Sequence, residues 1–173
     1  MSFSEQQLID CSSSYGNNGC NGGFYDNGFS YIEAGNKLVL ESQYAYTGVQ
    51  GTCSYNSNTN TGVGSISSFV DIAGNSTTAL QSALVNGPVS VAIEADTTLF
   101  QSYSSGVITD SGCGVNVDHA VLAVGYGTDP TYGGYFLVKN SWSSSWGESG
   151  YVRIGSDQST SPAGVCGILS YPS

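Results

Sequence analysis

The stretch DHAVLAVGYGTDPTYGGYFLVKNSWSSSWGESGYVRI, residues 118–154, contains three apolar runs separated by turns rich in glycine and polar residues. Short apolar runs bounded by Gly, Asn, Asp and Ser are typical of strands, so each run predicts a β-strand: 119–126, 135–140 and 150–154. The segment 128–134 predicts a turn that pairs the first two strands in antiparallel fashion. Such pairing would bring His119 and Asn140 close together.

These two polar residues are candidates for chemistry. His119 is the only histidine of the chain, and a lone histidine is more often a packed residue than a general base. Asn140 favours the functional interpretation, because both tryptophans of the chain, Trp142 and Trp146, follow it closely. An amide at this place would give the imidazole a partner that orients it.

Patterns elsewhere in the chain predict three helices and a further strand. Ser4 and Gln7 predict the capped start of a short helix through Ile9. Apolar residues at helical spacing predict two more helices, and the apolar run behind the second of these predicts a buried strand: 24–34, 77–85 and 89–95.

The character of the sequence changes in its middle. Helical and loop patterns come first, whereas short runs of Val, Ile and Phe dominate after the polar, flexible segment TNTGVGS at 59–65. We therefore expect an α+β chain in two parts, a helical part at 1–65 and a β-rich part at 66–173.

Charge limits the classes of partner. The formal net charge is −10, and the only cations are Lys37, Lys139 and Arg153. Nucleic acid and anionic membrane surfaces attract basic patches, so neither is an expected partner. The chain has no apolar run of about 18 residues, and its first residues lack the basic and apolar regions of a signal peptide.

The five cysteines favour disulfides over metal. They are widely spaced and lack the CxxC pairs and clustered histidines of zinc sites, so we expect no metal and no other cofactor. Disulfides form in oxidising compartments such as the secretory pathway. The triplet Asn75-Ser76-Thr77 points to the same pathway, because it is an acceptor sequence for N-glycosylation. Because five is odd, one cysteine stays free or pairs outside the chain.

Several strings match one known family, in order and at roughly the family's spacing: SEQQLIDCS (4–12), GCNGG (19–23), GPVSVAI (87–93), DHAVLAVGYG (118–127) and KNSWSSSWGESGYVRI (139–154). Through them the chain resembles the papain and cathepsin L-like cysteine peptidases over almost its whole length. The resemblance implies a papain-like two-lobe α+β fold. Its helical lobe would be truncated at the N-terminus, and its second lobe would be antiparallel and β-barrel-like.

The resemblance also implies roles for the residues singled out above. His119 corresponds to the histidine that pairs with a nucleophilic thiolate and later protonates the leaving amine. Asn140 corresponds to the residue that orients this histidine, and Trp142 would cover their hydrogen bond. Asp118 corresponds to a neighbour that modulates the pair without being essential.

A substrate-binding strip is implied in the first part of the chain. Gly22 and Gly23 correspond to a backbone strip that pairs with an extended peptide or protein substrate. Phe24 and Tyr25 would help to wall a hydrophobic specificity pocket. A simpler interpretation is that the two glycines only introduce the next helix.

The resemblance accounts for the odd cysteine count. It implies one disulfide between Cys11 and Cys53 and another between Cys113 and Cys166. Cys20 remains unpaired, because its family partner stands just before the nucleophile. Cys20 is a poor candidate nucleophile itself, since it precedes the glycine strip in a tight loop instead of opening a helix that would lower its pKa.

The family nucleophile lies in a CGSCW-like segment about 130 to 150 residues before the histidine and asparagine. Residues 1–173 contain no such segment. The expected function is therefore that of a cysteine-type endopeptidase whose nucleophile lies in an N-terminal segment outside this chain, which leaves the chain alone inactive. The alternative is a non-enzymatic papain-like protein that binds peptides or partners.

Two further expectations follow from the resemblance. The acidic composition and the disulfides fit a lysosome, a vacuole or the extracellular space, with the signal and propeptide outside this chain. Ser143 and Ser145 stand where glycines are common in the family. The turn beside Trp146 is therefore the place where local geometry is expected to differ.

Overall fold

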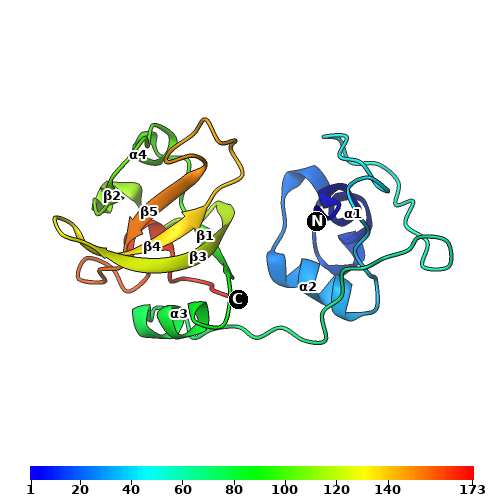
Figure 1. Ribbon diagram of the computed structural model, residues 1–173, viewed down its shortest axis with the longest axis horizontal. Helices are drawn as coiled ribbons and strands as arrows, with labels where there is room; N and C mark the ends of the chain where they lie inside the picture. Colours follow the sequence, from blue (N-terminus) through cyan, green and yellow to red (C-terminus); the bar gives the residue numbers. More distant parts are fainter. The chain divides into compact units, whose positions relative to one another are not determined.

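The computed structural model describes residues 1–173 and divides into two compact units, Met1–Val70 and Asp71–Ser173 (Figure 1). The division falls five residues after the boundary expected at 65/66. The first unit is built from helices and loops, and the second from a sheet with helices, as expected for an α+β chain. None of the helices combines the length and apolar character needed to span a bilayer.

The first unit contains α1 (Glu5–Cys11) and α2 (Tyr25–Glu33), with two 3₁₀ turns between them at Ser13–Tyr15 and Gly19–Asn21. The predicted cap of α1 is confirmed, because the Ser4 side chain accepts a hydrogen bond from the Gln7 backbone N–H. The helix runs two residues beyond the predicted Ile9.

A buried glutamine organises this unit. The side chain of Gln7 is fully buried. Its amide nitrogen donates to the Tyr31 hydroxyl at 3.0 Å and to the Lys37 carbonyl at 3.1 Å, and its oxygen accepts from the Val39 N–H at 2.9 Å. One side chain thus ties α1 to α2 and to the segment after it, where an apolar residue would leave backbone groups unpaired.

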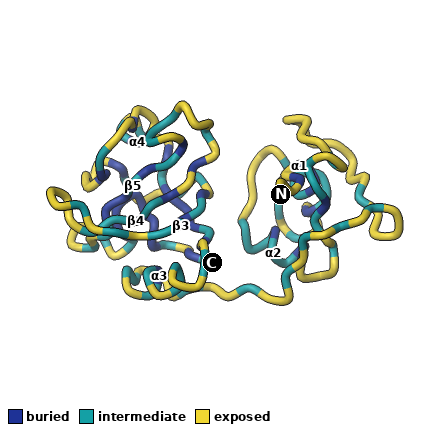
Figure 2. The backbone as a smooth tube through the Cα atoms, viewed as in Figure 1, coloured by how far each residue is buried: buried dark blue, intermediate teal, exposed yellow.

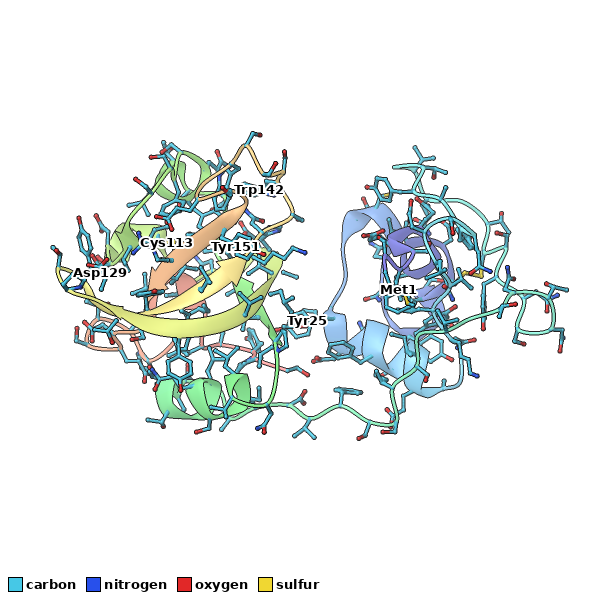
Figure 3. All side chains as sticks on the ribbon, viewed as in Figure 1. Met1, Tyr25, Cys113, Asp129, Trp142 and Tyr151 are labelled. Atoms are coloured by element: carbon cyan, nitrogen blue, oxygen red, sulfur yellow. A yellow bond between two sulfur atoms is a disulfide. The ribbon has the colours of Figure 1, made fainter.

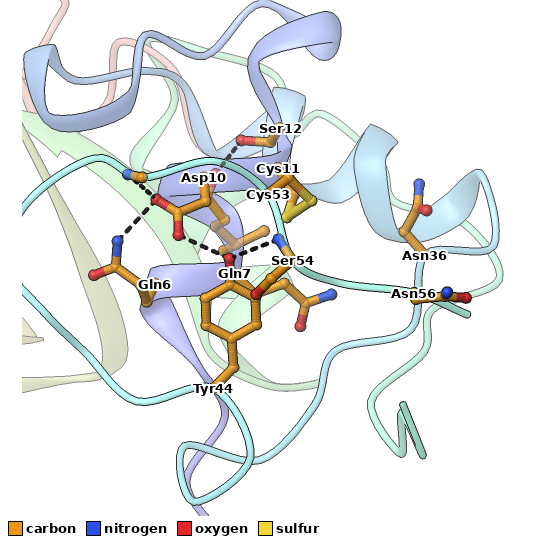
Figure 4. Close-up of a disulfide and its surroundings, with 12 residues drawn as sticks. Gln6, Gln7, Asp10, Cys11, Ser12, Asn36, Tyr44, Cys53, Ser54 and Asn56 are labelled. Atoms are coloured by element: carbon orange, nitrogen blue, oxygen red, sulfur yellow. Dashed lines mark hydrogen bonds between the residues drawn. A yellow bond between two sulfur atoms is a disulfide. The ribbon is translucent and has the colours of Figure 1, made fainter. Parts of the chain in front are cut away.

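A second polar cluster holds the loop that follows (Figure 4). The Asp10 carboxylate accepts hydrogen bonds from Gly51 N–H at 2.7 Å, Gln6 Nε2 at 2.9 Å and the Tyr44 hydroxyl at 2.8 Å. Burial alone would raise the pKa of Asp10, but these donors together lower it below its ordinary value. The neighbouring disulfide Cys11–Cys53 attaches the same loop to α1 covalently.

The second unit is a five-stranded sheet of order β1-β3-β4-β5-β2, formed by β1 (Val89–Ile93), β2 (Val107–Ile108), β3 (His119–Asp129), β4 (Gly133–Lys139) and β5 (Tyr151–Gly155). All pairings are antiparallel except that of β2 with β5. The expected antiparallel lobe is therefore present, with a two-residue parallel pairing at this edge. Residues 109–150 separate the two parallel strands, which is ample for the crossover that parallel pairing requires.

Helices α3 (Thr77–Leu84) and α4 (Thr98–Gln101) lie on either side of the sheet in Figure 1. The buried residues follow the strands, as the dark segments of Figure 2 show. The largest fully buried side chains of this unit are Phe100, Phe136, Leu80, Ile93, Ile154, Ile168 and Leu169. A disulfide, Cys113–Cys166, joins the short 3₁₀ turns Ser111–Cys113 and Val165–Gly167 beside this core.

The hairpin between β3 and β4 is tighter than predicted. Asp129 pairs with Gly133, so only three residues form the turn in place of the predicted 128–134. Both strands accordingly extend further into the hairpin than their apolar runs indicated. The helices predicted at 24–34 and 77–85 are confirmed as α2 and α3.

The buried amide of Gln7 provides the first test. Gln7→Met keeps the volume of the side chain but leaves the Val39 N–H and the Lys37 carbonyl without partners. We expect the free energy of unfolding to fall by about 2–6 kcal/mol, because each of the two unpaired buried groups costs about 1–3 kcal/mol. Urea unfolding followed by circular dichroism measures the loss. Gln50→Met, at an exposed glutamine, is the matched control, and equal losses in both variants would contradict this account.

Candidate active site

The second unit brings His119 and Asn140 together. His119 is the first residue of β3, opposite Ile93 of β1, and Asn140 directly follows β4. Leu122 of β3 pairs with Lys139 of β4, so the hairpin register places the histidine and the asparagine at the same end of the sheet. The distance between His119 Nε2 and Asn140 Oδ1 is 2.9 Å.

The hydrogen bonds at Asn140 define the tautomer of the histidine. Its Oδ1 also accepts from the backbone N–H of Ser141 at 2.8 Å. An amide oxygen can only accept, so His119 must carry its proton on Nε2. In the neutral imidazole, Nδ1 is then the basic nitrogen.

Asn140 is held at an energetic cost. The residue is only 7% exposed, and its side-chain Nδ2 is buried without a hydrogen-bond partner. A buried donor without a partner costs about 1–3 kcal/mol. The structure therefore keeps an amide here for the sake of its oxygen, which is the atom that contacts the imidazole.

Trp142, labelled in Figure 3, packs against the histidine of this pair. Its ring stacks on the His119 ring with centroids 5.1 Å apart and planes 29° apart. The Trp142 ring also makes edge-on contacts with Phe100 of α4 and with Trp146, at centroid distances of 5.5 and 5.4 Å. Phe100 is completely buried, so the indole above the histidine rests on the core of the unit.

Trp146 extends the same arrangement. It packs on Phe100 at 5.1 Å and on Tyr103 at 5.6 Å, and its indole N–H donates to the Gln101 carbonyl at 3.1 Å. We call Phe100, Tyr103, His119, Trp142 and Trp146 the aromatic cluster. Because the loop after β4 carries both tryptophans, the aromatic cluster fixes this loop against α4.

Asp118, the residue before His119, is bonded to the strand next to β3. Its carboxylate accepts from the Ala95 N–H at 2.8 Å, and its own N–H donates to the Ile93 carbonyl at 2.9 Å. Both bonds join the start of β3 to the end of β1. Asp118 therefore holds the backbone that presents His119.

The loop between Trp142 and β5 is tightly turned. Ser143 has φ +76°, a left-handed conformation that favours glycine. This is one of the two positions where glycine is common in the resembling family. At this position the chain has a serine that adopts the left-handed conformation typical of glycine.

Ser143→Gly is expected to stabilise the protein. The left-handed conformation costs a non-glycine residue roughly 1–2 kcal/mol, and the extra freedom of glycine in the unfolded chain offsets about 0.5–1 kcal/mol of the gain. We expect a net increase of about 0.5–1 kcal/mol in the free energy of unfolding, measured by urea denaturation. The control Ser145→Gly lies in the same loop at a residue without positive φ and should destabilise instead. A loss of stability in both variants would refute the conformational argument.

An ion pair closes this loop onto β5. Arg153 donates from Nε and Nη2 to both oxygens of Glu148 at 2.9 and 2.7 Å, and from Nη1 to Asp129 at 3.0 Å. Glu148 also accepts from the Gly106 N–H at 3.0 Å. The hydrogen bonds from Arg153 lower the pKa of the Glu148 carboxyl below its ordinary value. The arginine thereby links the loop of Trp142 to β5 and to the end of β3.

Arg153→Met should weaken this unit in a pH-dependent way. The ionised Glu148 would lose its partner while about three-quarters buried, its side chain being 28% exposed, so we expect a loss of about 1–3 kcal/mol at neutral pH. Because the folded pKa of Glu148 is lowered, the pair stabilises above the unfolded carboxyl pKa of about 4.3. Its contribution disappears as pH falls through the lower folded pKa.

The difference in unfolding free energy between the wild type and Arg153→Met should therefore shrink in acid, which urea unfolding across a pH series measures. Lys139→Met, at an exposed cation on the neighbouring strand, is the matched control and should change stability by less than about 0.5 kcal/mol. A loss for Arg153→Met that is independent of pH would show that packing, not charge, is responsible.

The predicted substrate-binding residues lie in the first unit, at the start of α2. Gly22 has φ +99°, and no atom lies within 4 Å of the Cβ that a side chain would add. A Cβ on Gly23 would collide with the side-chain oxygen of Asn17, which accepts from the Phe24 N–H at 3.0 Å. Both glycines are thus required by the loop itself, and Gly22 also leaves open space beside the backbone.

The two aromatic residues after the glycines adjoin each other. Phe24 is the N-cap of α2 and is 49% exposed. Its ring meets that of Tyr25 at 6.1 Å, and Tyr25 meets Phe29 at 6.4 Å. An aromatic surface therefore follows directly on the glycine strip.

The cysteines leave a single free thiol. Cys113 and Cys166 form a disulfide in the second unit, and Cys11 and Cys53 form one in the first. Cys20 is free and exposed, in the 3₁₀ turn Gly19–Asn21 of the first unit. Within Asp71–Ser173, the unit that holds His119, both sulfur atoms are therefore bound in a disulfide.

Some parts of the site were not found from the sequence. Phe100 lies on the four-residue helix α4, which is too short to show helical periodicity. Glu148 and Arg153 become partners only because the chain turns back into β5. The only sequence signal of the aromatic cluster is the pair of tryptophans close behind Asn140. This signal points to Asn140 but does not reveal that the tryptophans pack on Phe100 and Tyr103.

Comparisons with known proteins identify the family of the chain. The family described as "Papain family cysteine protease" matches residues 1–173. The chain is 45% identical to "Cathepsin L" of Sarcophaga peregrina and 46% identical to "Germination-specific cysteine protease 1" of Arabidopsis thaliana, over 99% of its own length in each case. It covers 50% and 46% of those proteins. The chain thus spans about half the length of the curated relatives it matches.

Solved structures match as well. The bromelain protease of Ananas comosus, in complex with the E64 inhibitor, superimposes with a TM-score of 0.88 at 34% identity. A cysteine protease of Carica candamarcensis superimposes with a TM-score of 0.87 at 38% identity. Each match covers 99% of this chain and 76% of the other. The papain-like α+β fold is thereby confirmed, and the chain belongs to the papain family of cysteine proteases.

Proposed function

We propose that this chain is the part of a cysteine endopeptidase that supplies the catalytic base and its orienting amide. One observation carries the proposal: His119 Nε2 lies 2.9 Å from Asn140 Oδ1, beneath the stacked ring of Trp142. A histidine with a fixed tautomer, in a member of a cysteine protease family, is suited to activate a thiol.

The reaction would begin at Nδ1 of His119. A thiol from a residue outside 1–173 transfers its proton to Nδ1, and the resulting thiolate attacks the carbonyl carbon of the peptide. The imidazolium returns the proton to the leaving amine, which breaks the C–N bond and leaves an acyl-enzyme. Water, deprotonated by the same nitrogen, then hydrolyses the thioester.

Asn140 and Trp142 keep the base in place throughout this cycle. Oδ1 of Asn140 holds the Nε2 proton in both the neutral and the charged imidazole, so the ring does not need to turn between steps. Trp142 excludes water from this hydrogen bond and lowers the local polarity, which strengthens it. Asp118 acts as a positioning residue, through the backbone at the start of β3.

The substrate would be an extended peptide or protein. Gly22 leaves open space beside its backbone, and an extended chain recognises such a strip by main-chain hydrogen bonds. Phe24 and Tyr25 then present aromatic surface to a side chain of the substrate. A hydrophobic residue is accordingly the preferred one at that position.

A location in the secretory pathway fits this activity. Two disulfides require an oxidising compartment. The relatives include "Cathepsin L" of Sarcophaga peregrina and "Digestive cysteine proteinase 2" of Homarus americanus. We infer a lysosome, a vacuole or the extracellular space as the site of action.

The test compares residues 1–173 with a longer protein in which a CGSCW-like segment is placed before Met1. Both are assayed on a fluorogenic dipeptide amide at acidic pH with a reducing thiol. We expect turnover from the longer protein only. His119→Ala should lower its kcat/KM by at least about 10²-fold, because general acid–base catalysis contributes about 10²–10⁴-fold. Asn140→Ala should cost less, because it removes orientation and leaves the base.

Two results would overturn this proposal. Turnover by residues 1–173 that Cys20→Ser abolishes would make Cys20 the nucleophile. A transcript with an in-frame stop codon just upstream of Met1, together with peptide binding that is not followed by cleavage, would favour the non-enzymatic papain-like protein. The retained contact between His119 and Asn140 argues for the peptidase, since peptide binding alone has no use for a base with a fixed tautomer.

A further inference from the structure

The triplet Asn75-Ser76-Thr77 is the only Asn-x-Ser/Thr sequence in residues 1–173. Asn75 stands two positions before α3, and Ser76 caps that helix by accepting from the Ala79 N–H. The asparagine is exposed. The sequence requirement for N-glycosylation thus coincides with a surface turn, which is where such a modification is accommodated.

The backbone around Asn75 is fixed while the residue stays exposed. Its N–H donates to the Leu169 carbonyl at 2.7 Å, and its own carbonyl accepts from Gln158 Nε2 at 3.0 Å. Thr77 donates from its hydroxyl to the Ser156 carbonyl at 2.9 Å. These bonds anchor the turn to the body of the second unit through backbone groups and Thr77, and none of them uses Nδ2, the side-chain nitrogen of Asn75.

A purely conformational reason for this asparagine has to be separated from a chemical one. Asn75 has φ +56°, in the left-handed region that Asn and Asp tolerate better than other side chains. That explanation needs the shape of the residue and is satisfied equally by aspartate. Glycosylation needs the side-chain nitrogen Nδ2, which aspartate lacks.

We propose that Asn75 is N-glycosylated when the chain passes through the secretory pathway. The donor is an oligosaccharide linked to a lipid diphosphate. Asn75 Nδ2 attacks the anomeric carbon of the first sugar and forms a C–N bond, while the C–O bond to the diphosphate breaks. The amide loses one proton, and the lipid diphosphate leaves with the bonding electron pair. This proposal rests on the oxidising compartment that the disulfides require, and it is independent of the peptidase function.

Asn75 and the aromatic cluster adjoin different helices of the second unit. Asn75 leads into α3, which lies on one side of the sheet in Figure 1, whereas α4 lies on the other. Trp142, labelled in Figure 3, packs on Phe100 of α4. Asn75 therefore adjoins a different helix from the one on which the aromatic cluster packs.

The test uses the 173-residue chain, directed into the secretory pathway of eukaryotic cells by an added leader. We expect the wild type to migrate more slowly than its deglycosylated form after treatment with peptide N-glycosidase. Asn75→Asp should abolish the shift while keeping the left-handed turn. Thr77→Ser should retain the shift, because it keeps the required hydroxyl, and Thr77→Val should lose it.

The controls make each outcome decisive. The sugar is transferred to the nascent chain, so a variant that folds poorly still reports whether the triplet is used. Mass spectrometry after enzymatic removal of the glycan should find aspartate at position 75. A wild type that shows no shift, in cells where an unrelated acceptor protein is modified, would overturn the proposal, as would a shift that survives Asn75→Asp.

Discussion

The register of the β3–β4 hairpin is the constraint on which the rest of the candidate site depends. Leu122 opposite Lys139 sets His119 and Asn140 at one end of the sheet. Successive residues of a strand point to opposite faces, so a slip of one position would turn one partner away from the other. The register of the turn Pro130–Tyr132 does not reach the site unchanged, because a bulge between Ala123 and Gly125 shifts it by one residue and so sets Leu122 opposite Lys139. A local feature of the chain thus controls a contact between residues that are 21 positions apart.

The aromatic cluster converts this placement into a stable geometry. The hydrogen bond between the imidazole and the amide is covered by an indole that itself rests on the buried Phe100. The unpaired Nδ2 of Asn140 and the left-handed Ser143 are two local costs in the same region. Conflicts of this kind concentrate where function constrains a sequence more than stability does. The surrounding core and the Glu148–Arg153 pair offset them.

Much of this fold is readable from local patterns, and the exceptions have a common cause. The Ser4 cap, α2, α3 and the long strands carry their own periodicity or capping residues, so they were predicted. Val107 and Ile108 form a two-residue strand that exists only because β5 offers an edge to pair with. Phe100 and Arg153 matter through partners that are distant in the sequence. At the candidate site, the sequence predicts His119 and Asn140 as the reactive pair. The contacts that hold this pair in place cannot be predicted from local patterns, because they form between segments distant in the sequence.

The aromatic cluster also gathers the only histidine of the chain and both of its tryptophans. Every imidazole resonance in a nuclear magnetic resonance spectrum of this protein, and all of its indole fluorescence, therefore originates at the same place. The protonation of His119 and the packing above it are observable spectroscopically without labels, probes or residue assignment.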